Sequence, residues 1–99
     1  MAESEAGEIT LNADEERWQL KRGADEAFLA YMRHGDLLYL THTEVPDAFR
    51  GEGLGTKLVV AAMVFARKEH LTVVPFCPFA RAYLEKHRKD YDDIVRWGD

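Results

Sequence analysis

Three glycines within five residues separate a strand-like run from a long apolar segment with helical spacing. They are Gly51, Gly53 and Gly55, and the run before them covers residues 37–45. Glycine adopts positive φ at little cost and lets a ligand approach bare backbone. The first turn of a helix carries unpaired N–H groups at the positive end of its dipole. The sequence therefore predicts a strand, a tight loop and a helix start that binds an anion such as phosphate, although a glycine-rich turn with only a folding role fits the spacing equally well.

The loop matches neither of two common nucleotide motifs. The phosphate loop of nucleoside triphosphatases needs a Gly-Lys-Ser/Thr sequence, and none follows the glycines. The NAD-binding loop needs another glycine three residues further on, where Thr56 and Lys57 stand instead. The predicted anion site belongs to neither class.

The segment before the loop predicts strands joined by short turns. Residues 9–11, 16–21 and 27–32 have the length and alternation of half-buried strands, and their spacing is typical of an antiparallel meander. In residues 37–40 every position is apolar, which predicts a central strand covered on both faces.

Beyond residue 40 that strand becomes polar, and its two-residue period assigns each side chain to a face. One face is predicted to carry Leu38, Leu40, His42 and Glu44, and the other Tyr39, Thr41, Thr43 and Val45.

The rest of the chain predicts a central helix, a short strand and a final helix. The stripe that packs on the sheet is Leu54, Leu58, Ala61, Ala62 and Phe65. The opposite side is also apolar at Val59, Val60, Met63 and Val64, which indicates cover from other strands or from a second copy of the chain, a homo-oligomer. A strand over residues 71–74 and a helix over residues 79–88 follow. The tail over residues 91–97 docks either as a strand or as a helical turn.

Composition narrows the functional classes. A chain of 99 residues forms one domain, here 1–99, with a single core. Its net charge of -5 argues against general nucleic-acid binding, which needs a basic surface. The same charge is compatible with a basic binding partner, such as a protein lysine or a polyamine. The single cysteine excludes an internal disulfide, and no apolar run approaches the length of a membrane helix. Residues 1–8 are acidic and predict a frayed end rather than a secretory signal. We expect a cytoplasmic protein with no membrane partner, and we predict no metal site.

Two motifs carry a resemblance to a known family. Residues 45–55 read VPDAFRGEGLG, and residues 42–46 and 75–79 read HTEVP and PFCPF. The first resembles the acetyl-CoA loop of the GNAT superfamily of N-acetyltransferases, and the others resemble a short, single-domain branch with a cysteine after its last core strand. The resemblance covers residues 37–91. It implies a GNAT-like α/β (α+β) fold, with a mixed, mostly antiparallel sheet of about five strands, a central helix after strand four and a C-terminal helix.

The resemblance also implies a reaction, in which an amine attacks the thioester of acetyl-CoA directly and releases coenzyme A. The amine acceptor is unknown, and a protein lysine or a small polyamine fits. Catalysis then consists mainly of orienting two bound reactants and removing a proton. The predicted cofactor-binding residues are Val45, Arg50, Gly51, Glu52, Gly53, Leu54, Gly55 and Thr56.

Two residues of the strand before the loop are candidate catalytic bases. His42 and Glu44 project from one face of that strand. A histidine titrates near neutrality without adjustment, whereas a glutamate needs burial to act at neutral pH. Hydrogen bonding to neighbours at a strand end explains both residues equally well.

Cys77 is the third candidate catalytic residue. Pro78 follows it, and proline favours the first position of a helix, so Cys77 is predicted to be the N-cap, where the helix dipole favours a thiolate. Three interpretations stay open. Cys77 accepts the acetyl group transiently, or it lines the acetyl pocket or gives a proton to the departing CoA thiolate, or it is a small buried apolar residue.

The sequence departs from the GNAT pattern at two places. Many members use a tyrosine on the last helix to protonate the thiolate, and alignment from Cys77 puts Leu84 there, with Tyr83 one residue earlier. The turn over residues 12–15 leaves no room for the helices that shape the acceptor site in larger members. These departures favour an alternative, a non-catalytic CoA-binding module that acts as a sensor or partner subunit. Four cations are candidates for the 3′-phosphate of CoA, although a solvated charge at a helix end explains any one of them better: Lys57, Lys86, His87 and Arg88.

Overall fold

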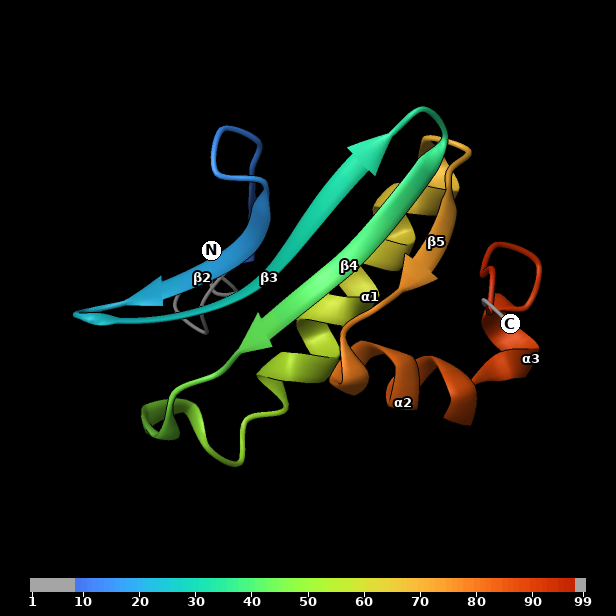
Figure 1. The fold of residues 1–99 in the computed structure, drawn as a ribbon. Helices are drawn as coiled ribbons and strands as arrows, with labels where there is room; N and C mark the ends of the chain where they lie inside the picture. The colour runs from blue at the N-terminus through green and yellow to red at the C-terminus, as the bar shows by residue number, and fades with distance from the viewer. Residues whose placement is uncertain (1–8, 98–99) are drawn as a thin grey trace.

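The computed structural model describes residues 9–97, which form a five-stranded sheet with helices beside it (Figure 1). The elements are β1 (Thr10–Asn12), β2 (Arg17–Arg22), β3 (Asp25–His34), β4 (Leu37–Glu44), a 3₁₀ helix (Asp47–Phe49), α1 (Leu54–Lys68), β5 (Thr72–Pro75), α2 (Pro78–Lys86) and α3 (Arg88–Tyr91). Strands neighbour one another in chain order; the first four are antiparallel, and β5 runs parallel to β4. The predicted mixed sheet, with its helix after the fourth strand, is confirmed. The expectation for residues 1–8 lies outside the described residues.

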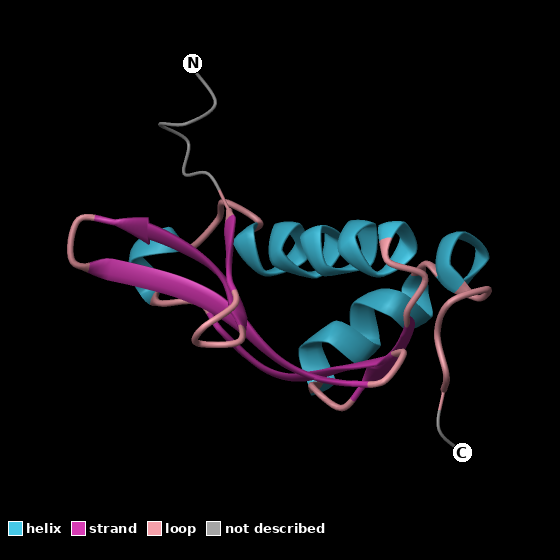
Figure 2. Cartoon of the chain, turned by 90° about the horizontal axis from the view of Figure 1, so that it is seen from above, coloured by secondary structure: helices cyan, strands magenta, loops and turns pink. Residues whose placement is uncertain are grey.

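The sheet curves around α1 and α2, which both lie on its concave side (Figure 2). Alternate side chains of β2 and β3 point into this side, as their alternating burial shows. The ring of Trp18 lies 4.7 Å from the ring of Tyr31 and 5.6 Å from that of Phe65 on α1. Aromatic pairs at these distances add to the stability gained from burial alone, so they help to hold α1 against the sheet.

The second apolar side of α1 is covered only in part. Val59 and Met63 are buried within the chain, whereas Val64 is 62% exposed. The helix ends at basic residues, Arg67 and Lys68, which complement the negative end of its dipole.

Cover on both faces of β4 was a wrong prediction. Leu38 and Leu40 are completely buried on the concave side, but Leu37 and Tyr39 are only half-buried on the other. The convex face carries no helix among the described residues (Figure 2). Residues 37–40 therefore form a strand segment with one buried face and one half-buried face.

A β-bulge interrupts the pairing of β3 with β4 at the point where the strand becomes polar. Ala30 pairs with His42, but the next residue, Tyr31, pairs with Leu40, so Thr41 is an extra residue on β4. An extra residue reverses the faces to which the following side chains point. The alternation predicted from the sequence is therefore wrong beyond Leu40.

The contacts beyond the bulge show the new assignment. Thr43 now lies on the side of the helices, with its Oγ1 3.0 Å from Sγ of Cys77. His42 and Glu44 lie on the convex face, where the ring of His42 is 5.9 Å from that of Phe28. One extra residue thus places Thr43 where the sequence pattern predicted the two candidate bases.

The tail docks beside β5, as the strand-like one of the two forms that the sequence left open. After α3 (Arg88–Tyr91) the chain turns at residues 92–94, and Val95 then forms a parallel bridge with Val73. The N–H of Val73 donates to the carbonyl of Ile94 at 2.7 Å, and the N–H of Arg96 donates to the carbonyl of Val73 at 2.8 Å. Within residues 9–97, no helix combines the length and apolar character needed to cross a bilayer.

Candidate active site

The site begins where β4 and β5 separate. Their pairing stops at Leu40 and Pro75. The N–H groups of Phe76 and Cys77 both donate to the carbonyl of Leu40, at 3.0 and 2.8 Å, and close this corner. Beyond it, β4 continues to Glu44 with a strand neighbour, β3, on one side only among the described residues. An open strand edge offers backbone donors and acceptors to an extended ligand.

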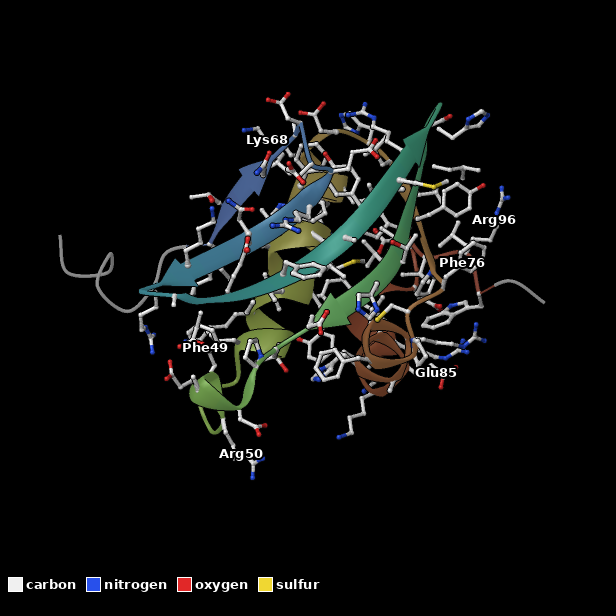
Figure 3. The ribbon with its side chains drawn as sticks, turned by 60° about the vertical axis from the view of Figure 1, so that its left-hand side comes forward. Phe49, Arg50, Lys68, Phe76, Glu85 and Arg96 are labelled. Atoms are coloured by element: carbon white, nitrogen blue, oxygen red, sulfur yellow. The ribbon has the colours of Figure 1, made fainter. Side chains whose placement is uncertain are left out.

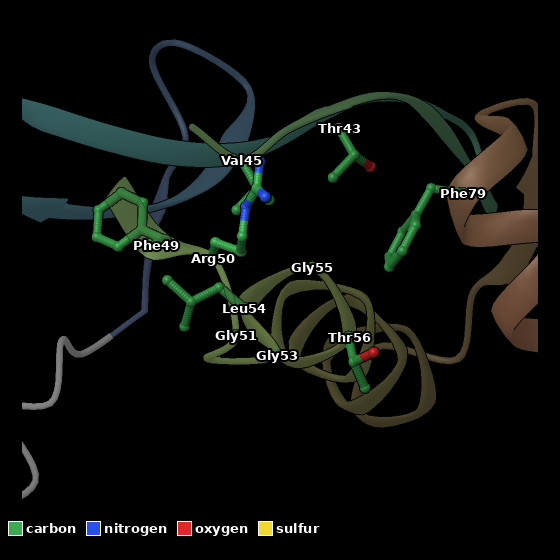
Figure 4. A pocket seen from close by; sticks show the side chains of 10 residues that line it. All are labelled: Thr43, Val45, Phe49, Arg50, Gly51, Gly53, Leu54, Gly55, Thr56 and Phe79. Atoms are coloured by element: carbon green, nitrogen blue, oxygen red, sulfur yellow. The ribbon is translucent and has the colours of Figure 1, made fainter. Parts of the chain in front are cut away.

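A pocket of about 390 Å³ lies between this open edge, the glycine loop and the starts of α1 and α2 (Figure 4). Its lining residues are Thr43, Val45, Phe49, Arg50, Gly51, Gly53, Leu54, Gly55, Thr56 and Phe79. Thr43 reaches into it from β4 and Val45 from the residue after β4, and the Phe79 ring projects into it from α2 (Figure 4). The residues predicted to hold the cofactor all line this pocket except Glu52.

The loop and the helix start expose bare backbone to this pocket at three glycines, Gly51, Gly53 and Gly55. Gly51 and Gly53 have φ of 85° and 68°, a left-handed conformation that favours glycine. Gly53 is the N-cap of α1 and provides no side-chain cap. The first helical hydrogen bond runs from the N–H of Lys57 to the carbonyl of Gly53, at 3.1 Å. The N–H groups of residues 54–56 precede that bond, so they and the helix dipole form a site for an anion.

Gly55 is required for a different reason. Its φ is not positive, but a Cβ built on it would lie 2.8 Å from Cζ of Phe79. The Phe79 ring therefore packs directly on the backbone of α1, in the wall of the pocket. Two of the three glycines are therefore needed for positive φ in the loop, and the third is needed for close contact between α1 and α2.

The ion pair of Arg22 with Glu52 anchors the loop from outside the pocket. Glu52 receives two hydrogen bonds of 2.9 Å from Arg22 at the end of β2, and that guanidinium lies 5.0 Å from the ring centre of Phe49. The hydrogen bonds from Arg22 lower the pKa of Glu52. Arg50 points away from the loop and pairs with Asp47 at 3.1 Å (Figure 3). Glu52 therefore holds the loop to the end of β2 through its ion pair with Arg22. Sequence reasoning missed this role because Arg22 lies 30 residues away.

The two candidate bases lie together but outside this pocket. Nε2 of His42 is 3.3 Å from Oε1 of Glu44, and their side chains are 62% and 58% exposed. Both lie on the convex face, so β4 itself stands between them and the pocket. A reactant held in the pocket and a second one arriving at the convex face would therefore meet at the gap where β4 and β5 separate.

Cys77 is the N-cap of α2, as predicted, and it is buried, with 3% of its surface exposed. Its sulfur contacts the hydroxyl of Thr43, and Thr43 lines the pocket whereas Cys77 does not. Sequence reasoning missed Thr43 because the strict alternation placed it on the other face. The structure thus puts a hydroxyl between the pocket and the candidate cysteine.

The position at which many GNAT members have a tyrosine is part of the core here. Leu84 is completely buried. Tyr83 stacks on His87, with ring centres 4.3 Å apart, and helps to line a smaller cavity of about 170 Å³. Phe79 also lines that cavity, as does Lys86, one of the predicted phosphate-binding cations.

A mixed sheet that opens beside a glycine loop, with the pocket at the start of the following helix, defines an acetyltransferase-type domain. Residues 15–94 match the sequence profile of the family described as GCN5-related N-acetyl-transferase. This match covers most of the chain, and the protein belongs to this family.

Individual relatives agree with this assignment. The chain is 34% identical over 88 residues to Protein NATD1 of Mus musculus, an alignment that covers 84% of this chain and 80% of the mouse protein. It is 41% identical over 64 residues to Protein NATD1 of Xenopus tropicalis, across 64% of this chain and 59% of that protein. The NMR structure of a GCN5-like protein from Staphylococcus aureus superposes with a TM-score of 0.72 at 27% identity, covering 93% of this chain and 90% of that one.

Proposed function

We propose that the protein binds acetyl-CoA and transfers the acetyl group to an amine. The observation that carries this proposal is the pocket in which the uncapped start of α1 meets the open edge of β4. The N–H groups at residues 54–56, with Gly51 and Gly53, suit the pyrophosphate. The open edge of β4 suits the amides of the pantetheine arm, which would lie there as a strand does.

Each part of the chain has a separate task in this reaction. His42 or Glu44 takes a proton from the ammonium group of the acceptor, because both stand on the convex face from which an acceptor would approach. The neutral amine nitrogen then attacks the thioester carbon, the carbon–sulfur bond breaks, and the nitrogen gives up a second proton as the amide forms. Most of the acceleration then comes from holding two reactants in place, since no covalent intermediate is needed.

The acceptor is a cationic amine, such as a lysine of a protein or a polyamine. A net charge of -5 is compatible with a basic acceptor. The convex face is uncovered by helices in the described part of the chain, so a large acceptor reaches His42 without a channel. A protein lysine fits this open face better than a small metabolite, which usually needs an enclosed pocket.

One observation favours a second function, CoA binding without efficient transfer. The chain turns directly from β1 to β2 at residues 13–16, with no helix that would shape an acceptor site. In this case the domain acts as a sensor or partner subunit. The two functions differ in turnover, because a binding module incubated with acetyl-CoA and a lysine peptide releases CoA no faster than buffer does.

The first experiment is calorimetric titration with acetyl-CoA of the wild type and of Gly53→Glu. We expect micromolar binding that the carboxylate abolishes, because it repels the pyrophosphate and blocks the approach to the backbone. The control is Gly35→Glu, at a glycine with the same left-handed conformation, φ 62°, in the β3–β4 turn. Both substitutions strain the backbone similarly, so only a loss specific to Gly53 supports the proposed site. A folded wild type that does not bind acetyl-CoA refutes both functions.

A further inference from the structure

The corner where β4 and β5 separate holds a hydroxyl–thiol pair that the proposed function has not used. Oγ1 of Thr43 and Sγ of Cys77 are 3.0 Å apart. The backbone holds both residues in place, since Cys77 donates its N–H to Leu40 and Thr43 lies in the register of β3 with Leu29. The pair is therefore a built feature of the fold.

The two members of the pair differ in what they can touch. Thr43 lines the pocket, whereas Cys77 lies behind it with 3% of its surface exposed. A ligand that fills the pocket meets the hydroxyl of Thr43 first. A hydroxyl can donate one hydrogen bond while it accepts another, so it can link the thiol to a ligand atom.

We propose that Thr43 hydrogen-bonds the sulfur of bound coenzyme A, with the Cys77 thiol as the proton source behind it. This inference rests on the proposed function and assigns a role to a residue that is part of neither the glycine loop nor the candidate base pair. It accounts for the absence of a tyrosine at Leu84, because the proton for the leaving sulfur comes from the other end of α2.

The proton transfer balances without any further reactant. When the carbon–sulfur bond of acetyl-CoA breaks, the electron pair stays on the CoA sulfur. The Thr43 O–H proton moves to that sulfur, and the Cys77 S–H proton moves to the Thr43 oxygen. The products are the CoA thiol, an intact Thr43 hydroxyl and a Cys77 thiolate at the N-terminus of α2. Water or the proton released by the amine then restores the Cys77 thiol.

The test uses coenzyme A itself and needs no acceptor. The thiol ionisation of bound CoA is followed by thiolate absorbance from neutral to alkaline pH, with the complex of desulfo-CoA as the blank for protein groups. A hydrogen-bond donor favours the thiolate, so we expect the pKa of the bound CoA thiol to be lower in the wild type than in Thr43→Val by roughly one unit or more. Thr43→Ser keeps the hydroxyl and should behave like the wild type. Desulfo-CoA should bind all three proteins with equal affinity, which shows that the pocket is intact.

Each other outcome has a definite meaning. If CoA binds but its thiol ionises identically in the wild type and in Thr43→Val, the hydroxyl does not contact the sulfur, and this inference falls while the proposed function stands. If wild-type protein incubated with acetyl-CoA gains an acetyl group that Cys77→Ala does not, Cys77 is a nucleophile and the proton route is wrong. If CoA does not bind at all, both the proposed function and this inference are refuted.

Discussion

Replacing Gly55 by alanine tests whether the third glycine of the loop serves the ligand or the Phe79 ring. A Cβ on Gly55 would lie 2.8 Å from Cζ and 2.9 Å from Cε2 of Phe79. Carbon atoms in contact are ordinarily about 3.5–4.0 Å apart, so the ring has to move by roughly 0.7 Å or more. Phe79 is 45% exposed, which allows it to move in the free protein.

We expect the free energy of unfolding to change little. Alanine in place of glycine in a helix stabilises the fold by up to about 1 kcal/mol. Turning the ring away from its preferred rotamer costs about 0.5–1.5 kcal/mol. The two effects oppose each other, so the net change should stay within about 1 kcal/mol, or a shift of roughly 4–8 °C in Tm at most.

The affinity for acetyl-CoA should change much more. Phe79 lines the pocket, so a bound ligand prevents the ring from moving away and the overlap with the new methyl group appears as strain in the complex. Overpacking of this kind costs about 1–3 kcal/mol, which corresponds to roughly 5- to 150-fold weaker binding. Calorimetric titration of Gly55→Ala against the wild type measures this difference directly.

A double-mutant cycle decides between the two roles of Gly55. In a Phe79→Ala background there is no ring to displace, so adding Gly55→Ala should leave the affinity unchanged. Phe76→Ala serves as the control, because Phe76 is also an exposed ring but does not line the pocket. If Gly55→Ala weakens binding equally with and without the Phe79 ring, the glycine serves the ligand itself and our explanation is wrong.

Three further changes test other parts of the structure. Arg22→Met should weaken acetyl-CoA binding up to about fivefold, because it leaves the Glu52 carboxylate unpaired beside the anion site, and adding Glu52→Gln should restore part of the affinity in the same titration. Arg67 lowers the pKa of Asp93 from its ordinary value of 3.8, so the folded state binds that proton less tightly. The higher thermal stability of the wild type over Asp93→Asn should therefore be present above pH 4 and disappear as the pH falls through the lowered pKa. Leu84→Ala should cost about 2–5 kcal/mol in chemical denaturation, because a completely buried side chain leaves a cavity.

Patterns within a single element were enough to locate most strands and helices, whereas their arrangement in one mixed sheet was predicted from the family resemblance. The glycine cluster marked the start of α1, and proline after Cys77 placed that residue at the N-cap of α2, where the structure has it. Alternation located β2 and β3 to within a few residues. These features depend on neighbours in the chain, and their physical causes are therefore visible in a short window of sequence.

Features that depend on distant residues were missed. The tie between Arg22 and Glu52 joins a strand end to the loop across 30 residues, and neither residue differs from an ordinary surface charge in the sequence. The bulge at Thr41 was missed because an extra residue in one strand shows only against its partner β3. The contact of Phe79 with Gly55 likewise needs two helices to be packed together.

The bulge also explains how one short strand can serve both reactants. Without it, strict alternation would put Thr43 on the opposite side from Leu40 and would turn Glu44 toward the helices. With it, Thr43 faces the pocket and Glu44 lies beside His42 on the convex face. In the proposed reaction, the acetyl carbon lies at the gap where β4 and β5 separate, so the amine loses its proton toward the convex face and the CoA sulfur gains a proton from the pocket side. Because the two sites share three consecutive residues, 42–44, a shift in the register of β4 would disturb both proton transfers together.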